Sequence, residues 1–214
     1  FAVAMCIRHE RPEIPIAFAL SPFTPREQVR AGIEAGGHPR MFGRAGLLVG
    51  DDTGDYLTTA SGDVRIPVLR NALSAARQAR LILTIPGTKT IELAALGRPV
   101  VTITPLNAPE LVTINGPLTY LNRIPLVGIP LKRAAAVGVS RRFRHHTQPN
   151  MDAGRTLIRE MHGTVTPGRV ARVTLEAYDD RVWQHDSAAA LALLYRDHAG
   201  ASERMADSLL ALAS

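Results

Sequence analysis

The residues with the clearest chemical potential lie in the segment LILTIPGTKTIE, at 81–92, which begins with a run of apolar residues. A buried strand that turns at Gly87 into a helix leaves backbone N–H groups unpaired at the helix N-terminus, where the helix dipole favours negative charge. Gly87 would let the backbone approach a ligand closely, and the hydroxyls of Thr88 and Thr90 could add hydrogen bonds. This pattern is typical of a phosphate site.

Glu92 falls one turn into the same predicted helix, where its carboxylate could accept two hydrogen bonds from a ribose diol. Phosphate at the turn and ribose at the helix together describe a nucleotide diphosphate, in the crevice where open α/β sheets bind ligands. An ordinary helix start is the alternative, with a threonine as the cap and Glu92 favourable to the dipole. A P-loop fits poorly because Thr88 separates Gly87 from Lys89, whereas that motif needs glycine directly before lysine.

Two longer segments occur in order along the chain. The first reads VLRNALSAARQARLILTIPGTKTIELAALGRPVVTI, at 68–103, and contains the pattern Gly-Thr-x-Thr-x-Glu after a strand. The second reads QPNMDAGRTLIRE, at 148–160, and contains Pro-Asn-x-x-Ala-Gly-x-x-Leu-x-x-Glu. Both resemble the donor-binding half of the lipid-A-disaccharide synthases, which are glycosyltransferases of the GT-B fold. The resemblance spans residues 68–172.

The resemblance implies transfer of a diacylated glucosamine from UDP to a lipid sugar phosphate, with release of UDP and without a metal or other cofactor. By position in the motifs, Asn150 and Arg155 are implied as catalytic residues. The residues implied to bind nucleotide or substrate are Gly87, Thr88, Lys89, Thr90, Glu92 and Glu160. The competing interpretations are a turn role for Asn150 and a solvated helix position for Glu160. Without a metal, helix N-terminal amides and a cation such as Lys89 or Arg155 must neutralise the departing diphosphate.

The sequence also departs from the family pattern. The connection at 105–133 is longer than in the family, and the phosphate-binding Gly-Ser-Arg loop expected near the start of the domain is absent. The N-terminal domain that supplies the acceptor site and usually the catalytic base is missing as well. We therefore expect the chain to be the C-terminal piece of a longer protein and to be inactive alone. A MurG-like transferase and a UDP-N-acetylglucosamine epimerase are alternatives within the same fold.

Alternating strands and helices must position these residues, and each predicted strand is apolar on both faces. Strands are expected at 15–24, 46–50, 80–85 and 98–104, and helices at the start of the chain, at 26–37, 68–79, 88–97 and from Asp152 onward, with a break at Gly200. Prolines interrupt the segment at 105–149, between the last predicted strand and the helices that start at Asp152. This segment is expected to be mainly loop. The pattern is typical of an α/β fold with a Rossmann-like parallel sheet flanked by helices and with C-terminal helices. We expect a UDP-sugar-binding domain over 1–175, truncated at its N-terminus, and helices over 176–214 that pack on it or on the missing N-terminal domain.

The net charge of +6 is concentrated in one part of the chain. Nine lysines and arginines lie between Lys132 and Arg172 against two acidic residues, which predicts a surface that attracts phosphate, anionic lipid or nucleic acid. The expected partners are a UDP-sugar and a lipid acceptor, with an anionic membrane surface and a second copy of the chain as further candidates. Nucleic acid is expected only under the competing hypothesis of a non-catalytic basic module.

The composition also bears on whether the protein spans a membrane, is secreted or binds a metal. No stretch approaches the roughly 18 apolar residues that would span a bilayer, and no secretory signal is visible. We expect a cytoplasmic protein, with peripheral attachment to the inner membrane face as the finer possibility. The single cysteine, Cys6, excludes a two-cysteine metal cluster. His145 and His146 are either contacts for phosphate or lipid headgroups or ordinary loop residues, because adjacent histidines do not suit joint ligation of a metal.

Overall fold

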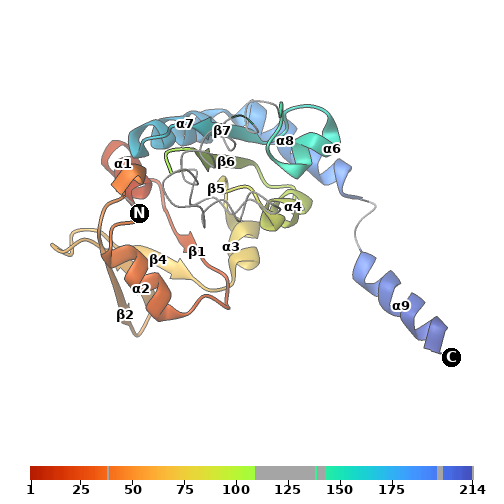
Figure 1. Ribbon diagram of the computed structural model, residues 1–214, viewed down its shortest axis with the longest axis horizontal. Helices are drawn as coiled ribbons and strands as arrows, with labels where there is room; N and C mark the ends of the chain where they lie inside the picture. Colours follow the sequence, from red (N-terminus) through yellow and green to blue (C-terminus); the bar gives the residue numbers. More distant parts are fainter. Residues whose placement is uncertain (38, 109–137, 139–142, 197–199, 214) are drawn as a thin grey trace, which may run out of the picture.

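The computed structural model describes residues 1–37, 39–108, 138, 143–196 and 200–213. These residues form an α/β structure with two sheets, one of which is fully parallel and flanked by helices (Figure 1). The predicted fold class is therefore confirmed. Most of the proline-rich stretch at 105–149 lies outside the described residues, and so does the prediction that it is mainly loop.

The parallel sheet has the strand order β5-β6-β7. Strands β5 (Ile82–Thr84) and β6 (Val100–Pro105) form where the sequence has the apolar runs predicted to be strands. The third strand, β7 (Arg159–Gly163), pairs with β6. Because all three run the same way, their last residues meet at one border of the sheet, here called the carboxyl edge. Their first residues meet at the opposite border, the amino edge.

Strand β7 corrects the prediction that the chain is helical from Asp152 onward. Helix α6 (Gln148–Ala153) ends at Gly154, whose φ of +63° lies in the left-handed region that favours glycine. The chain then bends, and Leu157 and Ile158 are buried as it enters the sheet. The helical prediction failed because the apolar spacing of this short segment also suits a strand.

Helices cover both faces of the parallel sheet. Helices α4 (Thr88–Ala95) and α8 (Arg181–Leu194) pack on one face. The core there consists of Ala76, Leu93, Ala94, Val100, Leu157, Ile158, Leu191 and Tyr195. Helix α7 (Pro167–Asp179) covers the other face, where Val170 packs with Met161 and partly buried Ile103. The sheet is thus buried on both sides, which explains why its strands are apolar runs.

Helix α8 passes along the amino edge. Near its start, the ring of Trp183 lies 4.3 Å from the guanidinium carbon of Arg159, the first residue of β7. Further along, the Ser187 hydroxyl donates to the Leu157 carbonyl at 2.8 Å, and Leu191 is fully buried in the core beneath α4. These contacts hold α8 against the start of β7 and the core beneath α4.

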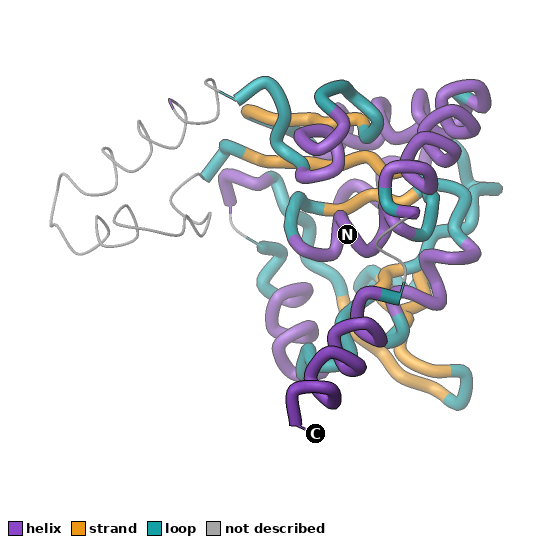
Figure 2. The backbone as a smooth tube through the Cα atoms, turned by 90° about the vertical axis from the view of Figure 1, so that its right-hand side faces the viewer, coloured by secondary structure: helices purple, strands orange, loops and turns teal. Residues whose placement is uncertain are grey.

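The second sheet has the order β1-β4-β3-β2 and contains the strands β1 (Phe18–Ala19), β2 (Leu47–Asp51), β3 (Gly54–Thr58) and β4 (Ile66–Leu69). Only β1 and β4 are parallel; β2, β3 and β4 are antiparallel neighbours. The prediction that the strands near 15–24 and 46–50 join one parallel sheet is therefore wrong. A tight turn is the reason, because Asp51 accepts from the Thr53 amide at 2.8 Å and Gly54 has φ +117°. The resulting hairpin projects away from the parallel sheet (Figure 2).

The N-terminal helices pack against these layers. Helix α1 (Ala2–Glu10) lies on α7, with Ile7 in one core cluster with Ala171. Helix α2 (Arg26–Glu34) covers β2, and a 3-10 turn, η1 (Pro39–Met41), follows it. Helix α3 (Ala72–Gln78) starts later than predicted, because the residues at 68–69 belong to β4 and Asn71 accepts from the Ser74 amide at 3.1 Å as the helix cap.

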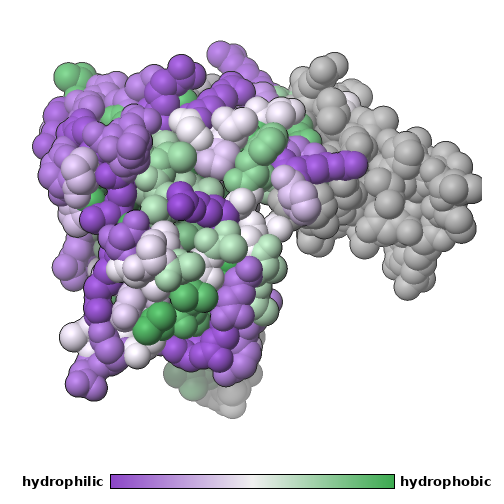
Figure 3. Space-filling view, turned by 90° about the vertical axis from the view of Figure 1, so that its left-hand side faces the viewer, coloured by the Kyte–Doolittle hydropathy of each residue, from purple (hydrophilic) through white to green (hydrophobic). Residues whose placement is uncertain are grey.

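The C-terminal part consists of helices, with the predicted break at Gly200. Helix α9 (Ala201–Ala213) stands apart from the sheets (Figure 1), and its side chains at 203–211 are exposed. The expected domain border at 175/176 falls inside α7. No helix in the described ranges is long and apolar enough to cross a membrane. On the face shown in Figure 3, hydrophobic and hydrophilic side chains are interspersed.

Candidate functional site

The first predicted motif lies where β5 ends and α4 begins, at the carboxyl edge of the parallel sheet. Buried Leu93 and Ala94 anchor α4 on the sheet, so its N-terminus is fixed at that edge. In parallel α/β sheets, ligands bind beyond the carboxyl ends of the strands. The structure therefore places the glycine turn where the sequence interpretation requires it.

Thr90 is a buried residue that stabilises the turn at Gly87 through two hydrogen bonds. Its hydroxyl accepts from the Gly87 amide at 3.1 Å, and its own amide donates to the Gly87 carbonyl at 2.9 Å. The side chain is 1% exposed. Thr90 thus serves as a helix cap, as in the alternative interpretation, and its hydroxyl is not directed at a ligand.

Gly87 and Thr88 are exposed and leave donors open. The amides of Thr88 and Lys89 donate no hydrogen bond within the described part of the chain. A Cβ built on Gly87 would meet no heavy atom within 4 Å, and its φ of 165° is extended backbone that any residue adopts. Glycine is therefore not required by the local fold, but it keeps the space in front of the two amides clear. This arrangement can accept an anion.

Lys89 and Glu92 form an ion pair on the first turn of α4. The lysine Nζ lies 2.9 and 2.7 Å from the two Glu92 oxygens, and the side chains are 62% and 36% exposed. Exposed pairs of this kind contribute only about 0–1 kcal/mol. A ligand could separate them at little cost, freeing the ammonium for a phosphate and the carboxylate for a diol.

Asn150, from the second motif, is completely buried and fully bonded. Its Oδ1 accepts from the amides of Leu157 at 2.7 Å and Ile158 at 2.8 Å. Its Nδ2 donates to the Ile158 carbonyl at 2.8 Å and to Glu160 at 2.6 Å. These bonds hold the turn between α6 and β7 and give Asn150 a positioning role, in line with the turn interpretation, while its catalytic role stays a prediction.

Glu160 was open to interpretation as a solvated helix position, but it is a half-buried residue of β7. Its carboxylate accepts from the amides of His146 at 2.8 Å and Thr147 at 2.9 Å, and from the Thr147 hydroxyl at 2.5 Å. Burial opposes ionisation, but the hydrogen bonds from Thr147, His146 and Asn150 outweigh it and hold the pKa of Glu160 below its ordinary value. Glu160 is an ionised anchor for the start of α6.

His162 was missed by the motif comparison. Its ring stacks on that of His146, with the centroids 4.4 Å apart, and His146 Nδ1 lies 3.4 Å from a Glu160 oxygen. His162 is exposed and pairs with Thr104 near the carboxyl edge. Only the two-residue alternation of a strand relates His162 to Glu160, and that signal is lost when the segment is interpreted as a helix. The histidines thus belong to the carboxyl edge.

The structure brings most of the predicted site together. Thr84, Thr102 and Glu160 occupy one row across the sheet, and α4 packs beside α6 on the same face. Arg155 does not join them. It is an exposed residue that precedes β7, so it lies toward the amino edge, whereas Gly87 follows β5 at the carboxyl edge.

Among the residues that the structure describes, no group of three or more His, Cys, Asp or Glu side chains could hold a metal ion. Comparisons of the chain with protein-family models, with curated proteins and with solved structures gave no match.

Proposed function

We propose that the chain binds the nucleotide-sugar donor of a glycosyltransferase of the lipid-A-disaccharide synthase type. Such an enzyme moves a diacylated glucosamine from UDP to a lipid sugar phosphate, working in the cytoplasm at the inner membrane face. One observation carries the proposal. At the carboxyl edge, two unpaired amides lie behind Gly87, whose missing side chain leaves them open, and Lys89 and Glu92 stand on the same helical turn.

The proposed site would bind the two parts of the donor through groups of opposite charge. The amides of Thr88 and Lys89 and the Lys89 ammonium would hold the diphosphate, while Glu92 would accept hydrogen bonds from the ribose hydroxyls. Negative charge grows on the diphosphate as the glycosidic bond breaks, and preorganised donors stabilise it without reorganisation. Asn150 and Glu160 act indirectly, by fixing α6 and β7 beside this turn.

Donor binding can be tested without turnover. Calorimetric titration of the chain with UDP-N-acetylglucosamine, UDP and ADP should show saturable binding of both uridine nucleotides and weaker binding of ADP. Glu92→Ala should weaken uridine nucleotide binding by about tenfold or more, the magnitude of hydrogen bonds to a charged group. Glu176→Ala is the matched control, because Glu176 is also an exposed helical glutamate, 3.9 Å from Arg172.

Each outcome bears on the proposal. If a folded sample binds no uridine nucleotide, the chain is not a donor domain. Equal affinity for ADP and UDP would leave a nucleotide site but contradict a uridine-specific enzyme. A diacylated UDP-glucosamine added to the titration separates the remaining alternatives, because tighter binding of UDP-N-acetylglucosamine would favour a MurG-like transferase or an epimerase.

A further inference from the structure

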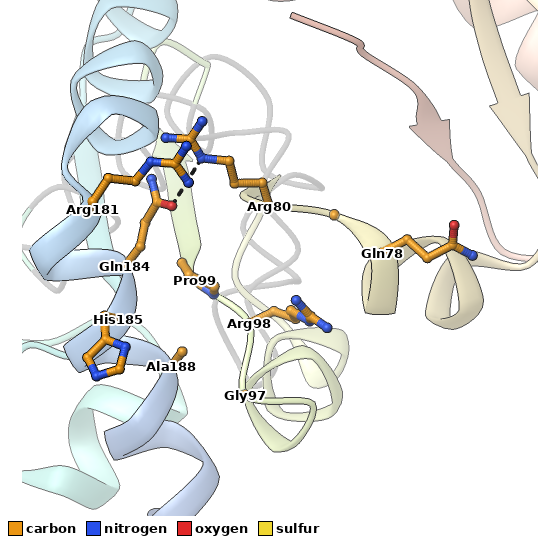
Figure 4. A pocket seen from close by; sticks show the side chains of 10 residues that line it. Gln78, Arg80, Gly97, Arg98, Pro99, Arg181, Gln184, His185 and Ala188 are labelled. Carbon is orange, nitrogen blue, oxygen red and sulfur yellow. Dashed lines mark hydrogen bonds between the residues drawn. The ribbon is translucent and has the colours of Figure 1, made fainter.

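A second concave site lies at the amino edge of the parallel sheet, opposite the proposed donor site. It is a cavity of about 460 Å³ between the starts of β5 and β6 and the first turns of α8 (Figure 4). Its lining residues are Gln78, Ala79, Arg80, Gly97, Arg98, Pro99, Arg181, Gln184, His185 and Ala188. The size falls within the range of about 300–1,000 Å³ typical of small-molecule sites.

Three arginines from separate segments line this cavity. Arg80 stands two residues before β5, Arg98 two residues before β6, and Arg181 is the first residue of α8. In Figure 4, Arg80 and Arg181 reach toward one another from opposite walls. The parallel sheet brings them together because it aligns the amino ends of its strands beside α8.

The cavity carries a strong charge imbalance. Its ionisable lining residues are Arg80, Arg98, Arg181 and His185, and no carboxylate lines it. Of the acidic residues next to the lining along the chain, Asp186 follows His185 and is exposed but does not line the cavity, and the two before Arg181 are engaged elsewhere. Asp180 binds Arg159 and caps α8 through the Trp183 amide at 2.9 Å, and Asp179 pairs with Arg11 at 3.1 Å. Within the described residues, the charge of the cavity is therefore not balanced locally, which favours an anionic ligand.

Arg98 shows an unmet bonding requirement. Its Nε atom is buried and has no hydrogen-bond partner among the described residues. Buried donors are nearly always paired, and a guanidinium can only donate. The described contacts of the protein thus leave the Arg98 guanidinium with unused hydrogen-bonding capacity.

Contacts with neighbouring residues fix the orientation of the Arg80 side chain. Its Nε donates to Gln184 Oε1 at 3.2 Å, another nitrogen donates to the Tyr178 carbonyl, and its guanidinium carbon lies 3.7 Å from the Tyr178 ring centroid. Gln184 is itself fixed by donation to the Ala177 and Tyr178 carbonyls, each at 2.7 Å. This packing fixes the orientation of the Arg80 fork, so less side-chain entropy is lost when a ligand binds.

We propose that this cavity binds a phosphate group through the arginines that line it, Arg80, Arg98 and Arg181. Guanidinium groups match phosphate oxygens in pairs, which is why arginine clusters recognise phosphate. The size of the cavity leaves room for more than the phosphate, so the ligand is a phosphorylated small molecule. The site is separate from the donor site, because the two occupy opposite edges of the same sheet.

The test is a titration of the intact chain with inorganic phosphate and with pyrophosphate, followed by calorimetry and by NMR. We expect saturable binding that weakens by about tenfold or more in Arg98→Gln and in Arg181→Gln, since each removes a charged hydrogen-bonding group. Arg77→Gln is the matched control, because Arg77 is an exposed arginine on nearby α3 that does not line the cavity. Arg181 is exposed, so its variant keeps the test valid if Arg98→Gln is misfolded.

Two further experiments distinguish this cavity from the donor site, and a free phosphate from a lipid headgroup. Lys89→Gln reports only on phosphate that binds at the donor site. Binding that is lost in Lys89→Gln but kept in Arg98→Gln and Arg181→Gln would place the anion at the donor site and overturn the proposal. Vesicles of phosphatidylcholine with and without phosphatidic acid test a lipid headgroup. If sedimentation with phosphatidic acid depends on Arg98 and Arg181, the phosphate belongs to a lipid. Absence of binding to phosphate, pyrophosphate and vesicles, or binding indifferent to both arginines, would refute the site.

Discussion

The two edges of the parallel sheet offer two different ways of holding an anion. At the carboxyl edge the donors are mainly backbone amides at the start of α4, and the nearby lysine is already paired with Glu92. At the amino edge the donors are guanidinium groups, and no carboxylate lines the cavity. Under the two proposals, the first edge suits a ligand that carries phosphate and a diol together, and the second suits the phosphate group of a phosphorylated small molecule. The difference follows from strand polarity, which places a helix N-terminus at one edge of the sheet and the arginine-lined cavity at the other.

The largest expected effect is a loss of stability at Asn150, which anchors α6 to the start of β7. Asn150→Ala should lower the free energy of unfolding by about 3 kcal/mol, because it leaves the buried amides of Leu157 and Ile158 without an acceptor. Urea denaturation followed by circular dichroism measures this loss. Gln148→Ala is the control on the same helix, where an exposed bond to Asp152 is removed and a change below about 1 kcal/mol is expected. Equal effects of the two substitutions would show that Asn150 is not an anchor.

A charge placed at Gly87 should separate the two edges functionally. Gly87→Asp keeps a good helix N-cap and adds a carboxylate where the open space faces the amides. UDP affinity should fall by about 10- to 100-fold, while phosphate binding at the amino edge stays unchanged. Calorimetry with UDP and with inorganic phosphate measures both. Gly87→Ser adds a Cβ without the charge and should cost less. Parallel losses at both edges would mean that the sites are not independent.

The contrast between the edges also explains what the sequence predicts. The carboxyl-edge turn is one continuous segment, so its apolar run, its glycine and its helix start are visible at 81–92 before any fold is known. The amino-edge cavity depends on Arg80, Arg98 and Arg181, which lie in separate segments and all outside the basic stretch at 132–172. Local charge counting cannot find such a site, since only the sheet brings these arginines together.

The fold prediction failed where strand pairing or strand identity depends on features that local apolar patterns do not report. Strands β5 and β6 were visible as apolar runs because both of their faces are buried. β3 and β4 show burial that alternates or covers only part of the strand, and their pairing depends on the turn at Gly54, a feature that apolar patterns do not report. The helical interpretation of β7 concealed that Glu160 and His162 share one face of the sheet. The motif named Asn150 and Glu160 as important, but only the hydrogen bonds show that they position the chain.

Acid should weaken the junction of α6 and β7 through Glu160. Because hydrogen bonds hold its pKa below the ordinary value of 4.5, the stabilising effect of this carboxylate is fully present above that pH. It is lost as the pH falls further, through the lower pKa of the folded state. The unfolding free energy of Glu160→Gln should therefore be below that of the wild type at neutral pH, and the gap should narrow in acid. Urea denaturation across pH 3–7 measures this, with Glu176→Gln as the exposed control. A gap that is constant with pH would contradict an ionised anchor.

The smallest expected change in stability occurs at the Lys89–Glu92 pair, and it tests whether that pair belongs to folding or to binding. Lys89→Gln should alter the free energy of unfolding by less than about 0.5 kcal/mol, because both side chains are exposed and water replaces the lost contact. UDP affinity should nevertheless fall, since the ammonium is the one side-chain cation on the first turn of α4. A double-mutant cycle with Glu92→Gln, measured by denaturation and by calorimetry, gives the coupling energy in each process. Coupling that is near zero in stability but clear in binding would show that the pair opens for the ligand. Coupling confined to stability would make it an ordinary surface ion pair and would leave the carboxyl edge with backbone donors alone.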